Sequence, residues 1–254
     1  MRRKTEFNKP PIVLMGTTDT EVQLIACKLT DPVGYIYGDC TFTEGYLDGY
    51  PVVVVLNLVG VANAAFATTI VIETYKPRCV IFNGTSGAHN PDLHKGDIVL
   101  GKKIISHTVA TPRRKEGEGV GSPEEMKFFG IESLVDGVTK SQEALHSSKE
   151  LLEIAERVPY NKGVLRCGTI LTGDFWNREI DKIKFYHKTF GTDCEEMEGF
   201  SIAHVCKKLD TPVLIVRIIS NSEYYPEEEF DPQLGVQCQE YTFEVMREII
   251  KSTK

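Results

Sequence analysis

Short apolar runs rich in β-branched residues alternate along the chain with longer stretches whose apolar residues recur at helical spacing. The apolar runs predict strands at residues 12–15, 52–58, 79–82, 97–100, 164–171 and 213–219. The intervening stretches predict helices at residues 21–28, 62–75, 142–158, 200–209 and 237–251. Several strands are apolar on both faces, so helices should cover the sheet on both sides. We expect an α/β fold with a central mixed β-sheet flanked by helices.

The length of 254 residues and the hydrophobic content of 41% suffice for one sizeable core. We therefore expect a single domain over residues 1–254. Its polar and basic start, residues 1–11, is predicted to be a flexible tail. Residues 110–125 combine glycines with charges and predict an exposed loop. This loop is either a lid or a surface insertion without a role.

Charge and cysteine usage narrow the class of partner. A formal net charge of -7 argues against nucleic-acid binding, which usually needs a basic surface. No apolar run approaches the roughly 20 residues that span a bilayer, so no membrane partner is expected. Seven cysteines without a CxxC pair or a Cys/His metal spacing are typical of reduced thiols in a cytoplasmic protein with no metal. A small molecule is the expected partner.

In α/β sheets the ligand lies at the carboxyl ends of the strands, so the polar residues that follow each strand matter. Glu21 follows the first strand, at a helix start where it could act only as a cap. The third strand is followed by a glycine and hydroxyl loop that includes Thr85, Ser86 and Gly87. Its glycines allow the backbone to approach a ligand, although the loop lacks a P-loop lysine.

Two later junctions carry aromatic and acidic residues. The fifth strand is followed by Phe175, by Trp176, which is the only tryptophan, and by Asn177. An aromatic residue there could stack on a base or could belong to the core. Carboxylates at 195, 196 and 198 immediately precede the helix at 200–209, where they could either cap the helix or bind a ligand.

The Glu196-Met197-Glu198 segment, with residues 203–206 and 216–221 behind it, resembles the signature of the methylthioadenosine/S-adenosylhomocysteine nucleosidases. These enzymes belong to the purine nucleoside phosphorylase/uridine phosphorylase superfamily. Further similar blocks occur in the same order at residues 21–22, 59–64, 84–87, 95–97 and 172–174. The resemblance therefore covers most of the chain.

The resemblance implies a nucleoside phosphorylase-like fold and a cofactor-free homodimeric enzyme that hydrolyses the N-glycosidic bond of a purine nucleoside. By position, Glu21 would activate the attacking water, Glu198 would hold the ribose hydroxyls and Asn221 would face the purine. Phe230 is a candidate for closing the 5′ side of a neighbouring subunit's site. The other substrate-binding residues implied are Val59, Thr85, Ser86, Gly87, Phe175, Trp176, Asn177, Glu196, Met197, Arg217 and Ser220. For Arg217, direct contact with the substrate and a structural role are equally supported; in the structural role it would form a salt bridge that holds Glu198 or Glu21.

Two departures from the family pattern bear on the reaction. Where related phosphorylases carry phosphate-binding arginines, this chain has residues 17–21 and 82–83, so water is favoured over phosphate as the nucleophile. Asn221 replaces the family aspartate that protonates N7 of adenine, and resembles the asparagine of phosphorylases that bind 6-oxopurines. The base therefore stays open between adenine and hypoxanthine or guanine. A phosphorylase, and a nucleoside-binding protein that has lost turnover, remain the alternatives.

Overall fold

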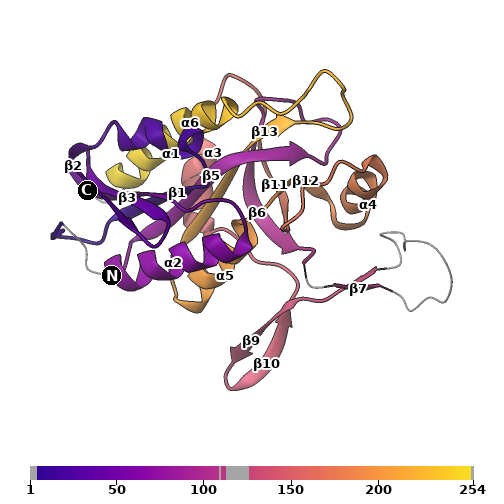
Figure 1. The fold of residues 1–254 in the computed structure, drawn as a ribbon, viewed down its shortest axis with the longest axis horizontal. Coiled ribbons are helices and arrows are strands. Elements are labelled where there is room, and N and C mark those ends of the chain that lie inside the picture. Colours follow the sequence, from indigo (N-terminus) through magenta and orange to yellow (C-terminus); the bar gives the residue numbers. More distant parts are fainter. Residues whose placement is uncertain (1–4, 109, 113–125, 253–254) are drawn as a thin grey trace.

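The computed structural model describes residues 5–108, 110–112 and 126–252. Nine strands form one mixed sheet in the order β12-β11-β6-β13-β5-β1-β4-β3-β2 (Figure 1). These strands are β1 (Ile12–Gly16), β2 (Thr30–Tyr37), β3 (Cys40–Leu47), β4 (Tyr50–Leu56), β5 (Cys79–Ala88), β6 (Ile98–Ser106), β11 (Leu165–Thr172), β12 (Thr192–Glu196) and β13 (Val213–Asn221). Two small hairpins pair β7 (Ala110–Pro112) with β8 (Met126–Phe128) and β9 (Ile131–Val135) with β10 (Val138–Gln142).

Helices cover both faces of the sheet and create two cores. The helices are α1 (Asp19–Ala26), α2 (Val61–Tyr75), α3 (Lys149–Arg157), α4 (Ile180–Phe190), α5 (Gly199–Lys208) and α6 (Leu234–Lys251). Along β1, Val13 and Met15 pack into the core under α2 and α5, whereas Ile12 and Leu14 pack under α1, α3 and α6. This alternation explains why the strand is apolar at every position.

Five of the strands close into a ring, because β12 pairs with β11 at one edge and also with β5. The second pairing is antiparallel and joins Glu195 to Gly87. It lies beyond Phe82, the last residue of β5 that pairs with β1. On the other edge of β5, Gly87 is paired with Asn221 of β13. The ring therefore brings β12 and β13 to either side of the same glycine.

The predicted fold class is confirmed, and each predicted strand and helix overlaps an observed one. The helix predicted at 142–158 is too long, because Leu145 forms a β-bridge with Ile104 and α3 begins only at Lys149. The sequence does not predict β2, β3, α4, the small hairpins or β12, whose acidic residues it places only in front of the helix at 200–209. No helix within the described ranges is long and apolar enough to cross a membrane.

The start of the chain makes contacts with the sheet. Phe7 packs edge-on against Tyr46, and the carbonyl of Pro10 accepts a hydrogen bond from Tyr50. The flexible tail stays a prediction, although these contacts tie Phe7 and Pro10 to the sheet, and residues 1–4 lie outside the described residues. The predicted exposed loop at 110–125 begins with strand β7, and its residues 113–125 also lie outside the described residues.

Candidate active site

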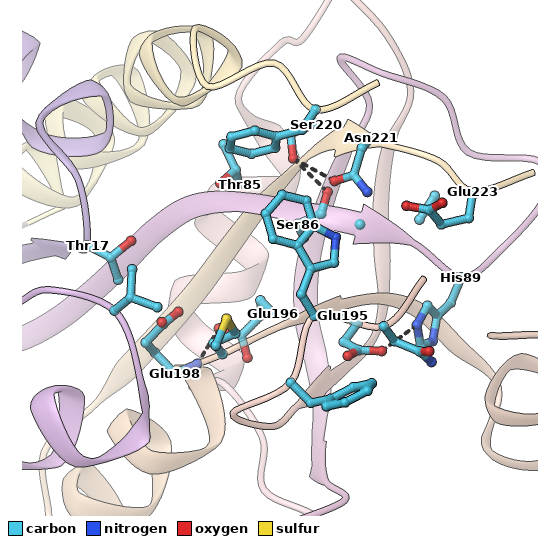
Figure 2. Close-up of a pocket in the computed structure, with 18 of the residues that line it drawn as sticks. Thr17, Thr85, Ser86, His89, Glu195, Glu196, Glu198, Ser220, Asn221 and Glu223 are labelled. Atoms are coloured by element: carbon cyan, nitrogen blue, oxygen red, sulfur yellow. Dashed lines mark hydrogen bonds and ion pairs between the residues drawn. The ribbon is translucent and has the colours of Figure 1, made fainter. Parts of the chain in front are cut away.

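A pocket opens at the carboxyl ends of β1, β5 and β13, where the polar strand ends meet (Figure 2). Every residue predicted for catalysis or binding lines it except Arg217, which is buried behind the wall. In Figure 2, Thr17 and Glu198 lie on one side of the pocket, and Asn221, Glu223 and His89 lie on the other. We call these sides the carboxylate end and the amide end.

At the carboxylate end, Glu21 is only 2% exposed and both of its oxygens accept hydrogen bonds. The backbone N–H and hydroxyl of Thr17 donate to Oε2 at 2.8 and 2.7 Å. The backbone N–H and hydroxyl of Thr85 donate to Oε1 at 2.8 and 3.1 Å. The side chain thus ties the turn before α1 to β5, so holding the turn and facing the pocket are compatible roles for the same residue.

Glu198 precedes the first residue of α5 and lies across from Glu21. The backbone N–H of Gly60 donates to its Oε1 at 2.8 Å, from a backbone with φ of 106° that favours glycine. Burial, followed by the nearby charge of Glu196, raises the pKa of Glu198 to about 8, against the lowering effects of Arg217 and the Gly60 N–H.

Glu196 is engaged by the protein on both carboxylate oxygens. Its Oε2 accepts from the backbone N–H groups of Glu198 and Gly199 at 3.1 and 2.7 Å, and its Oε1 accepts from the hydroxyl of Thr172. The helix-capping alternative therefore applies to Glu196, because its carboxylate satisfies the first N–H groups of α5. The same contacts fix the position of Glu198.

Arg217 supports this arrangement from behind. Its Nη2 lies 2.5 Å from Glu196 and 3.6 Å from Glu198, and its guanidinium stacks on the ring of Phe82 at 3.8 Å. A Cβ at Gly84 would lie 2.2 Å from Nη1, so only glycine leaves room for the guanidinium. Because Arg217 does not line the pocket, the structure favours the salt-bridge alternative over direct substrate contact.

At the amide end, Asn221 is 6% exposed and follows Ser220, whose hydroxyl lies 3.2 Å from its Oδ1. The Nδ2 atom of Asn221 makes no hydrogen bond in the described part of the chain and lies 3.3 Å from where a Cβ on Gly87 would be. Trp176 and Phe230 meet edge-to-face with ring centroids 5.1 Å apart, and both are about half exposed at the mouth.

Sequence reasoning missed His89 and Glu195 as residues of this pocket, which both of them line. His89 comes two residues after Gly87, and Glu195 was read only as one of the acids before a helix. The available signal was the β-prone pair Thr192 and Cys194, which flanks Asp193 and is compatible with a short strand. Recognising that strand required its pairing with β5, and the paired residues Glu195 and Gly87 lie 108 residues apart, so no local pattern reveals the pairing.

Carboxylates dominate the charges that line the pocket. Five glutamates line it, and none of the described lining residues is a lysine or an arginine. Such a lining can accept hydrogen bonds from hydroxyl groups, hold a water molecule and stabilise a developing cation. Within the described lining, no lysine or arginine would neutralise a bound dianion.

Comparison with known proteins gives a consistent result. The model of the phosphorylase superfamily matches residues 11–251. The 5′-methylthioadenosine/S-adenosylhomocysteine nucleosidase of Oceanobacillus iheyensis is 30% identical over 212 residues, which cover 83% of this chain and 85% of the relative. That of Tolumonas auensis is 28% identical over 213 residues, with coverage of 83% and 85%. The Neisseria meningitidis enzyme, solved with methylthio-immucillin-A, superposes with a TM-score of 0.76 at 25% identity over 96% of this chain and 100% of that chain.

Proposed function

The chain belongs to the phosphorylase superfamily, and we propose that it is a nucleosidase that hydrolyses the N-glycosidic bond of a purine nucleoside. The relatives are named for 5′-methylthioadenosine and S-adenosylhomocysteine, which supports a nucleoside with a substituted 5′ carbon. The products are the free base and the ribosyl hydrolysis product.

The observation that carries the choice of water over phosphate is the charge of the pocket. A phosphorylase must hold a phosphate dianion beside the ribose, which requires cationic or strongly donating groups. The carboxylate of Glu21 stands at this end, and the nearest guanidinium, that of Arg217, is already paired with Glu196. A dianion there would be repelled, whereas a neutral water molecule would be oriented.

Glu21 is the group that activates the water. The oxygen of the water attacks C1′ of the ribose, the C1′–N9 bond breaks, and its electron pair leaves with the purine. One proton of the water passes to Glu21, the remaining hydroxyl stays on C1′, and the departing purine takes up a proton from solvent. Four hydrogen bonds from Thr17 and Thr85 hold the carboxylate in one orientation, which reduces the reorganisation needed in the transition state.

Glu198 binds the ribose. Its carboxylate accepts hydrogen bonds from the sugar hydroxyls and favours the positive charge that develops on the ring as the C–N bond breaks. Met197 lines the pocket beside it and offers an apolar surface to the sugar. Glu196 and Arg217 are positioning residues, because their contacts go to Glu198 and to the start of α5.

Asn221 favours a second candidate function, a nucleoside-binding protein without turnover. Its amide can donate a hydrogen bond to the purine but cannot transfer a proton to N7, and general acid catalysis is typically worth about 10²–10⁴ in rate. Hydrolysis nevertheless remains the better-supported function, because Glu21 and Glu198 are both held in place on the ribose side.

We further propose that the protein is a cytoplasmic homodimer. Phe175, Trp176 and Phe230 are each about half exposed at the mouth of the pocket, where a second copy would cover them. The seven cysteines are all free, which suits a reducing compartment. Sedimentation equilibrium tests the dimer, and a monomer at micromolar concentration would contradict it.

The function is tested by incubating the purified protein with methylthio-substituted and unsubstituted purine nucleosides, with and without phosphate. We expect release of free base at the same rate in both buffers, with the free sugar and not the sugar 1-phosphate as co-product. A strict requirement for phosphate would establish a phosphorylase instead. Tight nucleoside binding without base release would establish the binding protein.

A further inference from the structure

Glu195 is a buried carboxylate that the hydrolytic mechanism does not use. It lines the pocket and is 7% exposed, yet neither of its oxygens accepts a hydrogen bond within the described residues. His89 Nε2 lies 2.8 Å from Oε2, but without the alignment of a hydrogen bond. Apart from this ion pair the buried carboxylate has no partner among the described residues, and Oε1 has none at all, so the pocket at this point can receive a donor from a ligand.

The position of Glu195 relative to Asn221 follows from strand register. Glu195 of β12 and Asn221 of β13 pair with opposite sides of Gly87 in β5. Residues that are paired across strands point to the same face of the sheet, and strands lie about 4.8 Å apart. The two side chains therefore flank a glycine that carries no side chain, and the amide of Asn221 lies 3.3 Å from where a Cβ of that glycine would be.

Two amide groups that line the pocket have unused donors. Asn177 is 6% exposed, and its Oδ1 accepts a hydrogen bond from the backbone N–H of Glu179. Its Nδ2 has no acceptor among the described residues. The Nδ2 of Asn221 is likewise without an acceptor. These residues present two amide donors and the carboxylate of Glu195, whereas the second carboxylate of this end, that of Glu223, is paired with Arg178.

We propose that the base bound here is a 6-oxopurine, with Glu195 as the residue that selects it. A 6-oxopurine presents N7 and O6 as acceptors and N1–H as a donor, which matches two amides and a carboxylate. Adenine presents an amino group at C6 and an unprotonated N1, whose lone pair would face the carboxylate. This inference deepens the proposed function and rests on it, because it concerns the base of the same nucleoside.

A purely structural role for Glu195 makes a different prediction. As a partner of His89 alone, the carboxylate would hold β5 against β12 and would not distinguish bases. His89 is already held by Thr192, whose hydroxyl lies 3.0 Å from Nδ1, and by stacking on Tyr186. The histidine therefore does not need Glu195 to be fixed in place.

The first experiment compares matched nucleosides that differ only in the base. We expect kcat/KM for inosine and guanosine, with or without a 5′-methylthio group, to exceed that of the adenosine counterpart at least tenfold. Calorimetry with free hypoxanthine, guanine and adenine gives the same comparison without turnover. Preferential hydrolysis or binding of adenine would overturn the inference and leave the proposed function intact. Release of no base would overturn the proposed function, and the calorimetric ranking would still decide the base.

The second experiment uses Glu195→Gln, whose amide can donate to N1 of adenine. We expect the ratio of kcat/KM for the 6-oxopurine to that for adenine to fall at least tenfold. Asp193→Asn is the matched control, because Asp193 lies on the same strand and contacts Thr169, Asn90 and Arg166 outside the pocket. It should lower stability without changing the ratio. An equal loss with both bases in Glu195→Gln would show a structural role and overturn the inference.

Discussion

The two ends of the pocket differ in how completely their polar groups are satisfied. At the carboxylate end, Glu21 and Glu196 accept hydrogen bonds on both oxygens, and Glu198 is held by Gly60 and lies near Arg217. At the amide end, Glu195 Oε1 and Asn177 Nδ2 are buried without a partner in the described residues, and Glu195 Oε2 has only the ion pair with His89. The polar groups of the carboxylate end are therefore oriented without a ligand, whereas those of the amide end leave hydrogen bonds for a ligand to make.

This difference fits the demands on each end. Transition-state stabilisation gains from groups that are already oriented, because no reorganisation is then needed during reaction. Recognition of a base gains from groups that remain unsatisfied when the wrong base binds, since an unpaired buried group is costly. The following variants test whether the two ends behave in these two ways.

Removing the cation behind the carboxylate end should have the largest effect. In Arg217→Met, Glu196 and Glu198 lose their buried partner, and breaking a buried pair costs about 3–5 kcal/mol of the free energy of unfolding. Urea denaturation measures the loss. The control is Arg247→Met, which breaks an exposed pair with Asp48 and should cost less than about 1 kcal/mol. Similar losses in both variants would contradict a preorganised carboxylate end.

Glu198→Gln should separate chemistry from base binding. We expect kcat to fall by about 10²–10³, the usual effect of removing one group that stabilises developing charge. The affinity for free base should change less than about threefold, because Glu198 lies on the ribose side. Steady-state kinetics and calorimetry on the same preparation provide both values. A near-normal kcat would show that Glu198 does not bind the ribose.

Asn221→Asp tests the amide end with a smaller expected effect. A carboxyl group buried there can donate a proton to N7, so hydrolysis of adenine nucleosides should rise by about 10², the lower end of general acid catalysis. Hydrolysis of 6-oxopurine nucleosides should fall, because O6 would meet a carboxylate. If adenine-nucleoside hydrolysis is unchanged or slower, the aspartate role of the relatives does not transfer to this pocket.

The sequence was informative wherever local pattern determines structure. The apolar strands and their polar ends predicted the sheet, and all three proposed catalytic residues and most proposed binding residues do line one pocket. The curved edge of β2 and β3 was missed, because its outer strand is largely exposed and lacks an apolar run. The strand at 192–196 was missed for the opposite reason, since its buried polar residues are typical of a helix start.

Arg217 and Glu195 show where sequence reasoning stopped. Both are charged residues next to predicted binding residues, and nothing local distinguishes a side chain behind the pocket wall from one in front of it. The guanidinium lies behind the wall because Gly84 of β5 leaves room for it, and the carboxylate reaches the pocket because β12 pairs with β5. Such contacts depend on the tertiary fold, which the pattern of one segment does not contain.

The last prediction concerns the pH dependence of the carboxylate end. The pKa of Glu198 is raised to about 8, mainly by burial, and the proposed role as acceptor for the ribose hydroxyls belongs to the ionised form. The value of kcat/KM should therefore rise about tenfold per unit as pH increases toward 8 and then level off. Stability should change in the opposite sense, because a pKa raised above the unfolded value of about 4.3 stabilises the protonated fold, and this contribution is lost as pH rises through 8. In Glu198→Gln the group cannot titrate, so the stability slope between pH 5 and 8 should become shallower. An identical slope in both proteins would assign the pH dependence to another group.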